Sequence, residues 1–159
     1  MTKEEAYNSA LFAYIVHHAY LAAVAQELGM EHARAFATPT LEKLGARQGQ
    51  MLKQQAGVEQ ADAAMACQLL DKVISATGVT SEIVELSPEK AVIRGGRCPI
   101  YEGARAVGFD HATCEHLCRT GALHFLDAAA KQLNPNLTYR LQAYRSGPED
   151  SCIEEIVMG

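Results

Sequence analysis

The sequence predicts an α+β domain in which a helical amino-terminal half packs on an antiparallel sheet of about four strands. Apolar residues recur at helical spacing up to about residue 77, and strict alternation replaces this spacing after Gly78. Two hairpin turns follow, at residues 87–90 and 147–148. A chain of 159 residues is long enough to bury one core, so we expect a single domain spanning residues 1–159.

Composition and charge exclude several classes of protein. Apolar residues make up 48% of the chain and charged residues 21%, which is typical of an ordered globular protein. The net charge of -5, without any basic stripe, argues against nucleic-acid binding. The longest apolar run is interrupted by His17 and His18 and is too short to span a bilayer, and no signal-peptide pattern precedes it. We therefore expect a cytoplasmic protein without membrane or nucleic-acid partners, and a homo-oligomer such as a homodimer.

Three helices are expected before residue 78. Thr2 and Glu5 have the spacing of a capping box at the start of the first helix. Pro39 is expected to break or bend the second helix, because proline removes a backbone hydrogen bond, and the chain can restart there. The expected ranges are about 2–29, 31–55 and 58–77.

The carboxy-terminal half combines two hairpins with two helices. The expected strands are 81–86, 90–95, 137–145 and 151–158, which we place in one antiparallel sheet. Between the hairpins, Pro99 is well placed at the first position of a short helix that ends by Gly108. Asp110 is expected to cap a longer helix that runs to about Leu133.

The cysteines are the main candidates for chemistry. In a reducing compartment, five cysteines are expected to be thiols or metal ligands rather than disulfides. As the N-cap of a helix, Cys98 would face unpaired backbone N–H groups and the positive end of the helix dipole, which predicts a lowered pKa. Cys114 and Cys118 share one helix face, and Cys152 lies on the last strand. We expect at least three of these four sulfurs to converge on one pocket, and Cys67 to lie in the core.

The residue types leave three uses of this cluster open. The four thiolates of Cys98, Cys114, Cys118 and Cys152, or three of them with His111, could hold a zinc ion or an iron–sulfur cluster. Alternatively, Cys98 is a catalytic nucleophile with His111 or His116 as the base. In the third interpretation the cysteines only pack as small apolar side chains.

Other side chains are candidates for binding a substrate. Arg97 or Arg145 could hold a carboxylate, because a guanidinium group matches it with two hydrogen bonds. Tyr101, in the first turn after Cys98, could contact a ligand. His17 and His18 are interpreted as a core or interface pair rather than a metal site.

The order of these features resembles the L-2-amino-thiazoline-4-carboxylic acid hydrolase family. The resemblance includes a Leu-Gly turn after the first helix, Gly45 and Gly49 on the second, and an Asn-Pro pair before the last hairpin. Its most specific part is the pattern of Cys98-Pro99, Cys114, Cys118 and Cys152. More remotely, the chain is similar to the small-molecule-binding domains named after 4-vinyl reductase.

The first resemblance implies a hydrolase that acts on a C–N bond, opening the ring of a cyclic amidine-like substrate such as an amino-thiazoline carboxylate. The second implies the alternative, a small-ligand- or metal-binding sensing module without enzymatic activity. Both imply helices packed on an antiparallel sheet and a small molecule as the partner.

Overall fold

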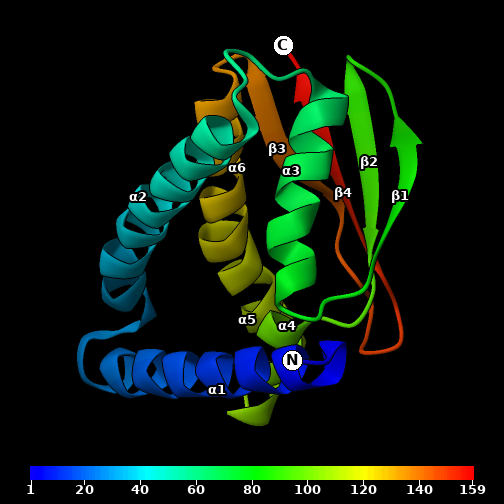
Figure 1. Cartoon of the computed structure of the whole chain (residues 1–159). Coiled ribbons are helices and arrows are strands. Elements are labelled where there is room, and N and C mark those ends of the chain that lie inside the picture. Colours follow the sequence, from blue (N-terminus) through cyan, green and yellow to red (C-terminus); the bar gives the residue numbers. More distant parts are fainter.

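The computed structural model describes all residues from 1 to 159 and has the predicted α+β architecture (Figure 1). Its elements, in order, are α1 (Lys3–Leu28), α2 (Met30–Ala56), α3 (Ala63–Ala76), β1 (Ser81–Leu86), β2 (Lys90–Gly95), α4 (Pro99–Ala106), α5 (His111–Leu117), the π-helix η1 (Cys118–Ala122), α6 (Leu123–Leu133), β3 (Leu137–Ala143) and β4 (Cys152–Met158). No strand precedes residue 81, so the prediction of a helical amino-terminal half is confirmed. No helix is both long enough and apolar enough to cross a membrane.

The first helix begins as predicted, whereas the second and third differ from the expectation. The capping box is present, with the backbone N–H of Glu5 bonded to the Thr2 hydroxyl and that of Thr2 bonded to the Glu5 carboxylate. The predicted break at Pro39 is wrong at the level of secondary structure, because α2 continues through it. The third helix starts five residues later than expected, since the Asp62 carboxylate accepts the N–H of Met65 and caps the helix there.

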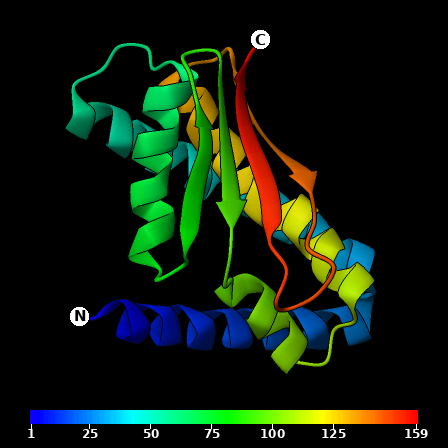
Figure 2. The ribbon, with the colours of Figure 1, turned by 90° about the vertical axis from the view of Figure 1, so that its right-hand side faces the viewer.

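The four strands form one antiparallel sheet in the order β1-β2-β4-β3. All helices that touch the sheet lie on one of its faces, and Figure 2 looks onto the other face. Alternation places one set of side chains toward the helices, as expected for period-two strands. This set comprises Ala91, Ile93, Leu137, Tyr139, Leu141, Cys152 and Ile156.

The main core lies between this face and the helices α3 and α6. It is one cluster of 18 buried residues, in which Leu70, Leu133 and Ile156 are completely inaccessible to solvent. Cys67 belongs to this cluster, as predicted. Apolar burial of this extent is the dominant stabilising contribution in a domain of this size.

Helix α2 packs mainly along α6. Gly45 and Gly49 face α6, where a Cβ atom would overlap the backbone carbonyl of Phe125 at the first position and that of Ala129 at the second. Glycine is therefore required at both positions for the two helix backbones to approach so closely.

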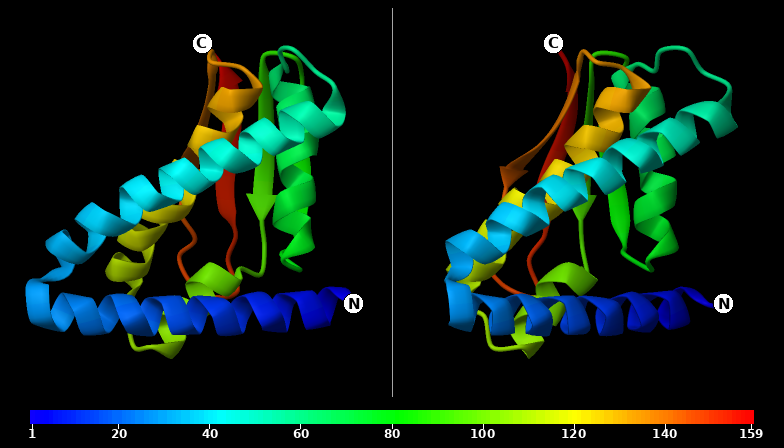
Figure 3. Two further views of the ribbon diagram at one scale, coloured as in Figure 1. Left: turned by 60° about the vertical axis from the view of Figure 1, so that its left-hand side comes forward. Right: turned by 90° about the vertical axis from the view of Figure 1, so that its left-hand side faces the viewer.

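The α1 helix, which carries the amino terminus, lies across the end of the molecule opposite the carboxy terminus (Figure 3). It packs mainly on α4 and α2. Three large apolar side chains on its outer side, Phe12, Val16 and Tyr20, are exposed. The expectation of a homo-oligomer stays a prediction.

The segment predicted as one long helix after Asp110 contains an unexpected π-helix. Asp110 caps α5 by accepting the N–H of Thr113, as predicted. The chain then passes through η1 before it continues as α6. Single-turn π-helices within α-helices occur frequently at functional sites, and this one carries Cys118.

Candidate functional site

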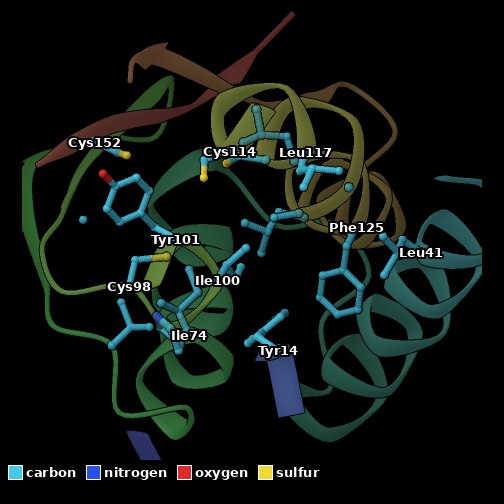
Figure 4. Close-up of a pocket in the computed structure, with 18 of the residues that line it drawn as sticks. Tyr14, Leu41, Ile74, Cys98, Ile100, Tyr101, Cys114, Leu117, Phe125 and Cys152 are labelled. Carbon is cyan, nitrogen blue, oxygen red and sulfur yellow. The ribbon is translucent and has the colours of Figure 1, made fainter. Parts of the chain in front are cut away.

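A cavity of about 350 Å³ lies between α1, α2, the η1 segment and the end of the sheet nearest α4 (Figure 4). Most of the residues that line it are hydrophobic. We call it the thiol cavity, because Cys98, Cys114, Cys118 and Cys152 all lie in its wall. A volume of this size fits a small organic molecule, and an apolar wall with few polar groups is typical of ligand pockets.

Cys98 has the predicted local structure but not the predicted pKa. It is the N-cap of α4 with Pro99 at the first helical position. Burial raises the pKa of its thiol, and the nearby backbone N–H groups of Tyr101 and Ile100 and the charge of Arg145 only oppose this rise. The predicted lowering of the pKa is therefore wrong, because burial in the cavity wall outweighs the helix terminus.

Cys114 and Cys118 project from α5 and η1 to the same cavity. Burial raises the pKa of Cys114 and raises that of Cys118 well above its usual value. Glu154, Cys98 and Cys152 add to the rise at Cys118, because like charges nearby disfavour a thiolate. Both cysteines are therefore neutral thiols at neutral pH.

Arg145 is the principal cation of this site and is only 2% exposed. Its Nε donates to the Cys152 sulfur at 3.4 Å, and its Nη2 donates to the backbone carbonyls of Gly95 and Gly96. Its guanidinium carbon lies 5.1 Å from the centre of the Tyr101 ring. No carboxylate forms an ion pair with Arg145. A buried guanidinium group without an anionic partner is costly unless a ligand supplies the anion.

Glu154 provides an acidic group on the same wall. Its carboxylate accepts a hydrogen bond from the Tyr139 hydroxyl, and burial raises its pKa above the usual value. Burial also raises the pKa of Tyr139 strongly, so its hydroxyl remains protonated. The cavity therefore combines a fixed cation, a half-buried carboxyl group and four thiols.

A metal site would require several of these side chains to surround one point. No group of three or more His, Cys, Asp or Glu side chains is arranged to hold a metal ion. The thiols of Cys98, Cys114, Cys118 and Cys152 thus share a cavity without forming a ligand set for zinc or an iron–sulfur cluster.

The remaining predicted site residues are divided between the cavity and the surface. Tyr101 is buried in the cavity wall. Arg97 lies outside it, exposed, and pairs with Glu4 and Glu102. Neither predicted base lines the cavity, since His111 packs against the rings of Tyr101 and Tyr144 and His116 is exposed. The structure therefore does not place a predicted histidine base beside Cys98.

Sequence reasoning missed two groups in the cavity wall. Glu154 is not among the site residues expected from the sequence, although strict alternation from Cys152 assigns it to the same face of β4. His18 was interpreted as a core or interface histidine, and it is buried, but it also lines the cavity. Its position is set by the packing of α1 on α4, which no local pattern reveals.

Two of three comparisons with known proteins find a match. The family model described as L-2-amino-thiazoline-4-carboxylic acid hydrolase matches residues 8–142. A search of curated proteins finds no match. Among solved structures, the chain is similar to the phenol-responsive sensory domain of the transcription activator PoxR with phenol, with a TM-score of 0.65, 15% identity, and coverage of 91% of this chain and 74% of that one. At this identity the likeness shows a shared fold only. In PoxR this fold forms a sensory domain. Because the family model covers most of its length, the chain belongs to the L-2-amino-thiazoline-4-carboxylic acid hydrolase family.

Proposed function

We propose that this protein is a hydrolase that opens a C–N bond in a small, carboxylate-bearing molecule bound in the thiol cavity. The observation that carries the proposal is the buried, unpaired guanidinium group of Arg145 beside the sulfur of Cys152. Family membership supports the reaction class.

Arg145 binds the carboxylate in this proposal. Its Nη2 and Nε are engaged by the protein, and Nη1 makes no hydrogen bond to the chain. Charge-assisted hydrogen bonds to a guanidinium group are among the strong ones, and the apolar surroundings strengthen them further. The ring of Tyr101 holds the guanidinium plane from one side.

Cys152 is the preferred nucleophile, and Cys98 is the alternative. The thiolate is the reactive form of cysteine. Only the sulfur of Cys152 accepts an N–H from Arg145, whereas burial raises the pKa of Cys98. Arg145 also lies near Cys98, but its charge offsets only part of the rise in the Cys98 pKa that burial causes.

The proposed reaction consumes one water molecule. The Cys152 thiolate attacks the carbon of a C=N bond and forms a C–S bond, while the π electron pair moves to nitrogen, which takes the proton of the Glu154 carboxyl group. A lone pair on the other heteroatom of this carbon then expels the nitrogen, which takes a second proton from a water molecule and leaves as an amine with the C–N electron pair. The hydroxide left from that water adds to the carbon. The thiolate is then released with the C–S electron pair as the carbonyl forms, and the hydroxyl proton restores Glu154.

The test uses 2-amino-thiazoline-4-carboxylate with the purified protein. We expect a product heavier by one water and carrying a free amine, detected by mass spectrometry. Arg145→Gln should lower kcat/KM about 10–100-fold, mainly through KM, because it removes a charge-assisted hydrogen bond worth about 1.5–3 kcal/mol. Arg97→Gln is the matched control and should leave both constants unchanged. Cys152→Ser should abolish turnover; loss in Cys98→Ser alone would transfer the nucleophile to Cys98.

Ligand binding without chemistry is the second candidate function. It is favoured by the raised pKa of Cys98, Cys114 and Cys118, which makes these thiols neutral parts of an apolar wall. It is also favoured by the fold shared with a sensory domain determined with phenol. Saturable binding of the carboxylate, weakened in Arg145→Gln but without product formation, would support this candidate over the hydrolase.

A further inference from the structure

His18 is a buried polar residue that the proposed reaction does not use. It lies on α1, is only 3% exposed and lines the thiol cavity. Its Nδ1 makes no hydrogen bond. Buried polar atoms are almost always hydrogen-bonded, and an unsatisfied one costs about 1–3 kcal/mol. A bound molecule would remove this cost if it supplied the missing partner.

Three aromatic rings pack around the imidazole ring of His18 and fix its orientation. The ring centre lies 6.0 Å from that of Tyr14, 5.3 Å from that of His17 and 6.2 Å from that of Phe109. Tyr14, one turn earlier on the same helix, reaches into the cavity from α1 (Figure 4). Aromatic packing on several sides holds the ring in one orientation.

The electrostatic environment keeps the ring neutral. Burial lowers the pKa of His18 to about 4, the charge of His17 adds to this, and the Tyr14 carbonyl only partly opposes it. A neutral imidazole nitrogen that lacks a proton is a hydrogen-bond acceptor. The wall at α1 thus suits an uncharged donor, whereas Arg145, where the chain leaves the sheet, suits an anion.

We propose that His18 is a second polar anchor of the thiol cavity, where Nδ1 accepts a hydrogen bond from a hydroxyl or N–H group of the bound molecule. The inference rests on the proposed binding of a carboxylate by Arg145 and adds a requirement to it. The preferred ligand then carries a carboxylate at one end, an uncharged hydrogen-bond donor at the other, and an apolar body between them.

The test uses three pairs of carboxylates whose members differ only in a terminal hydroxyl group. They are 4-hydroxybenzoate, 4-hydroxyphenylacetate and 3-(4-hydroxyphenyl)propionate, each compared with its parent compound that lacks the hydroxyl. Calorimetry should give about tenfold tighter binding of the hydroxylated member for at least one chain length, corresponding to about 1.4 kcal/mol. His18→Phe, which keeps an aromatic ring, should reduce this preference to within about twofold, and His32→Phe, on the exposed surface of α2, should preserve it.

A measurement on the unchanged protein covers the case in which His18→Phe does not fold. In protein with ¹⁵N-labelled histidine, the hydroxylated compound should shift the Nδ1 resonance of His18, and its parent should not. No hydroxyl preference at any length, or a preference that survives His18→Phe, would overturn the inference while Arg145-dependent binding would keep the proposed function. Binding that depends on His18 but not on Arg145 would overturn the proposed carboxylate site and keep the inference about His18. If none of the six compounds binds, both proposals fall.

Discussion

The two ends of the molecule are built on different principles. At the end near the carboxy terminus, α3, α6 and the sheet bury one continuous core of 18 residues. At the opposite end, beside α1 and α4, two buried clusters contain three residues each and flank a cavity. The first end is filled by side chains of the protein itself, and the second leaves space for another molecule.

Buried polar groups differ between the two ends in the same way. At the filled end, the amide of buried Asn134 donates to the Ala61 carbonyl and accepts the N–H of Asn136. At the cavity end, Arg145 has no anionic partner and His18 leaves Nδ1 unpaired. A buried polar atom without a partner costs free energy, and a bound molecule that supplied the partner would recover it. Of the two such side-chain atoms, His18 Nδ1 belongs to a residue that lines the cavity, whereas the Tyr7 hydroxyl does not.

Truncation of a core leucine should produce the largest loss of stability. Leu70→Ala should lower the free energy of unfolding by about 3–4 kcal/mol, because it removes completely buried methyl groups and leaves a void. Leu41→Ala, which enlarges an existing cavity, should cost about 1 kcal/mol. Denaturant unfolding measures both. Equal losses would contradict the distinction between a filled and an open end.

Addition of one methyl group between α2 and α6 should be almost as damaging. In Gly49→Ala the new Cβ would overlap the Ala129 carbonyl oxygen, and separation of the helices should cost about 3 kcal/mol despite the better helix propensity of alanine. Gly147→Ala is the control, because nothing lies within 4 Å of its added Cβ. Thermal unfolding should separate the two variants clearly, and an unchanged melting temperature in Gly49→Ala would show that the helices are not in close contact.

Most of the fold could be predicted because its signals are local. The capping box, the glycine at the end of α1, the Cys98-Pro99 helix start and the alternation in β3 each depend on a few adjacent residues. The errors have tertiary causes. Helix α2 continues through Pro39 while it packs along α6, and the Thr38 hydroxyl bonds to the backbone of η1. The π-helix itself has no sequence signal of this kind.

The candidate site could be predicted only in part. Spacing indicated that the cysteines share one region, and all four line one cavity. The direction of the pKa of Cys98 could not be obtained from its cap position, because it depends on how many groups from other elements exclude water from the sulfur. The place of His18 in the cavity wall likewise emerges only when α1 is positioned beside the cavity.

Acidification should weaken the cavity end through His18. Its pKa is about 4 in the folded protein and about 6.5 when unfolded, so the unfolded chain takes up the proton first as the pH falls. The stabilising effect of the neutral ring is complete above about pH 6.5 and is lost toward pH 4, by about 2–3 kcal/mol. The free energy of unfolding of His18→Phe should lack this component between those pH values. An identical pH dependence in both proteins would contradict the low pKa.

Cysteine alkylation rates should differ between the two ends, with a smaller effect than the changes in stability described above. Cys67, in the filled core, has a pKa raised by burial to about 11, whereas Cys98 is partly accessible. Iodoacetamide at neutral pH should therefore modify Cys98 at least about tenfold faster than Cys67, followed by peptide mass spectrometry. Both reactions should be slower than with a free thiol, because burial also raises the pKa of Cys98. Protection of Cys98 until the protein unfolds would remove it as an alternative nucleophile.

The smallest effect is expected at Arg97, which provides the sharpest contrast with Arg145. Both residues carry a guanidinium group near an aromatic ring, Arg97 at 3.6 Å from the centre of Tyr7. Arg97 is already paired with Glu4 and Glu102 at the exposed surface, where water and salt screen its charge. Benzoate affinity measured by calorimetry should therefore change by less than about twofold in Arg97→Gln and fall at least about tenfold in Arg145→Gln. An equal loss in both variants would mean that overall charge attracts the anion, and that burial without a partner does not mark the binding residue.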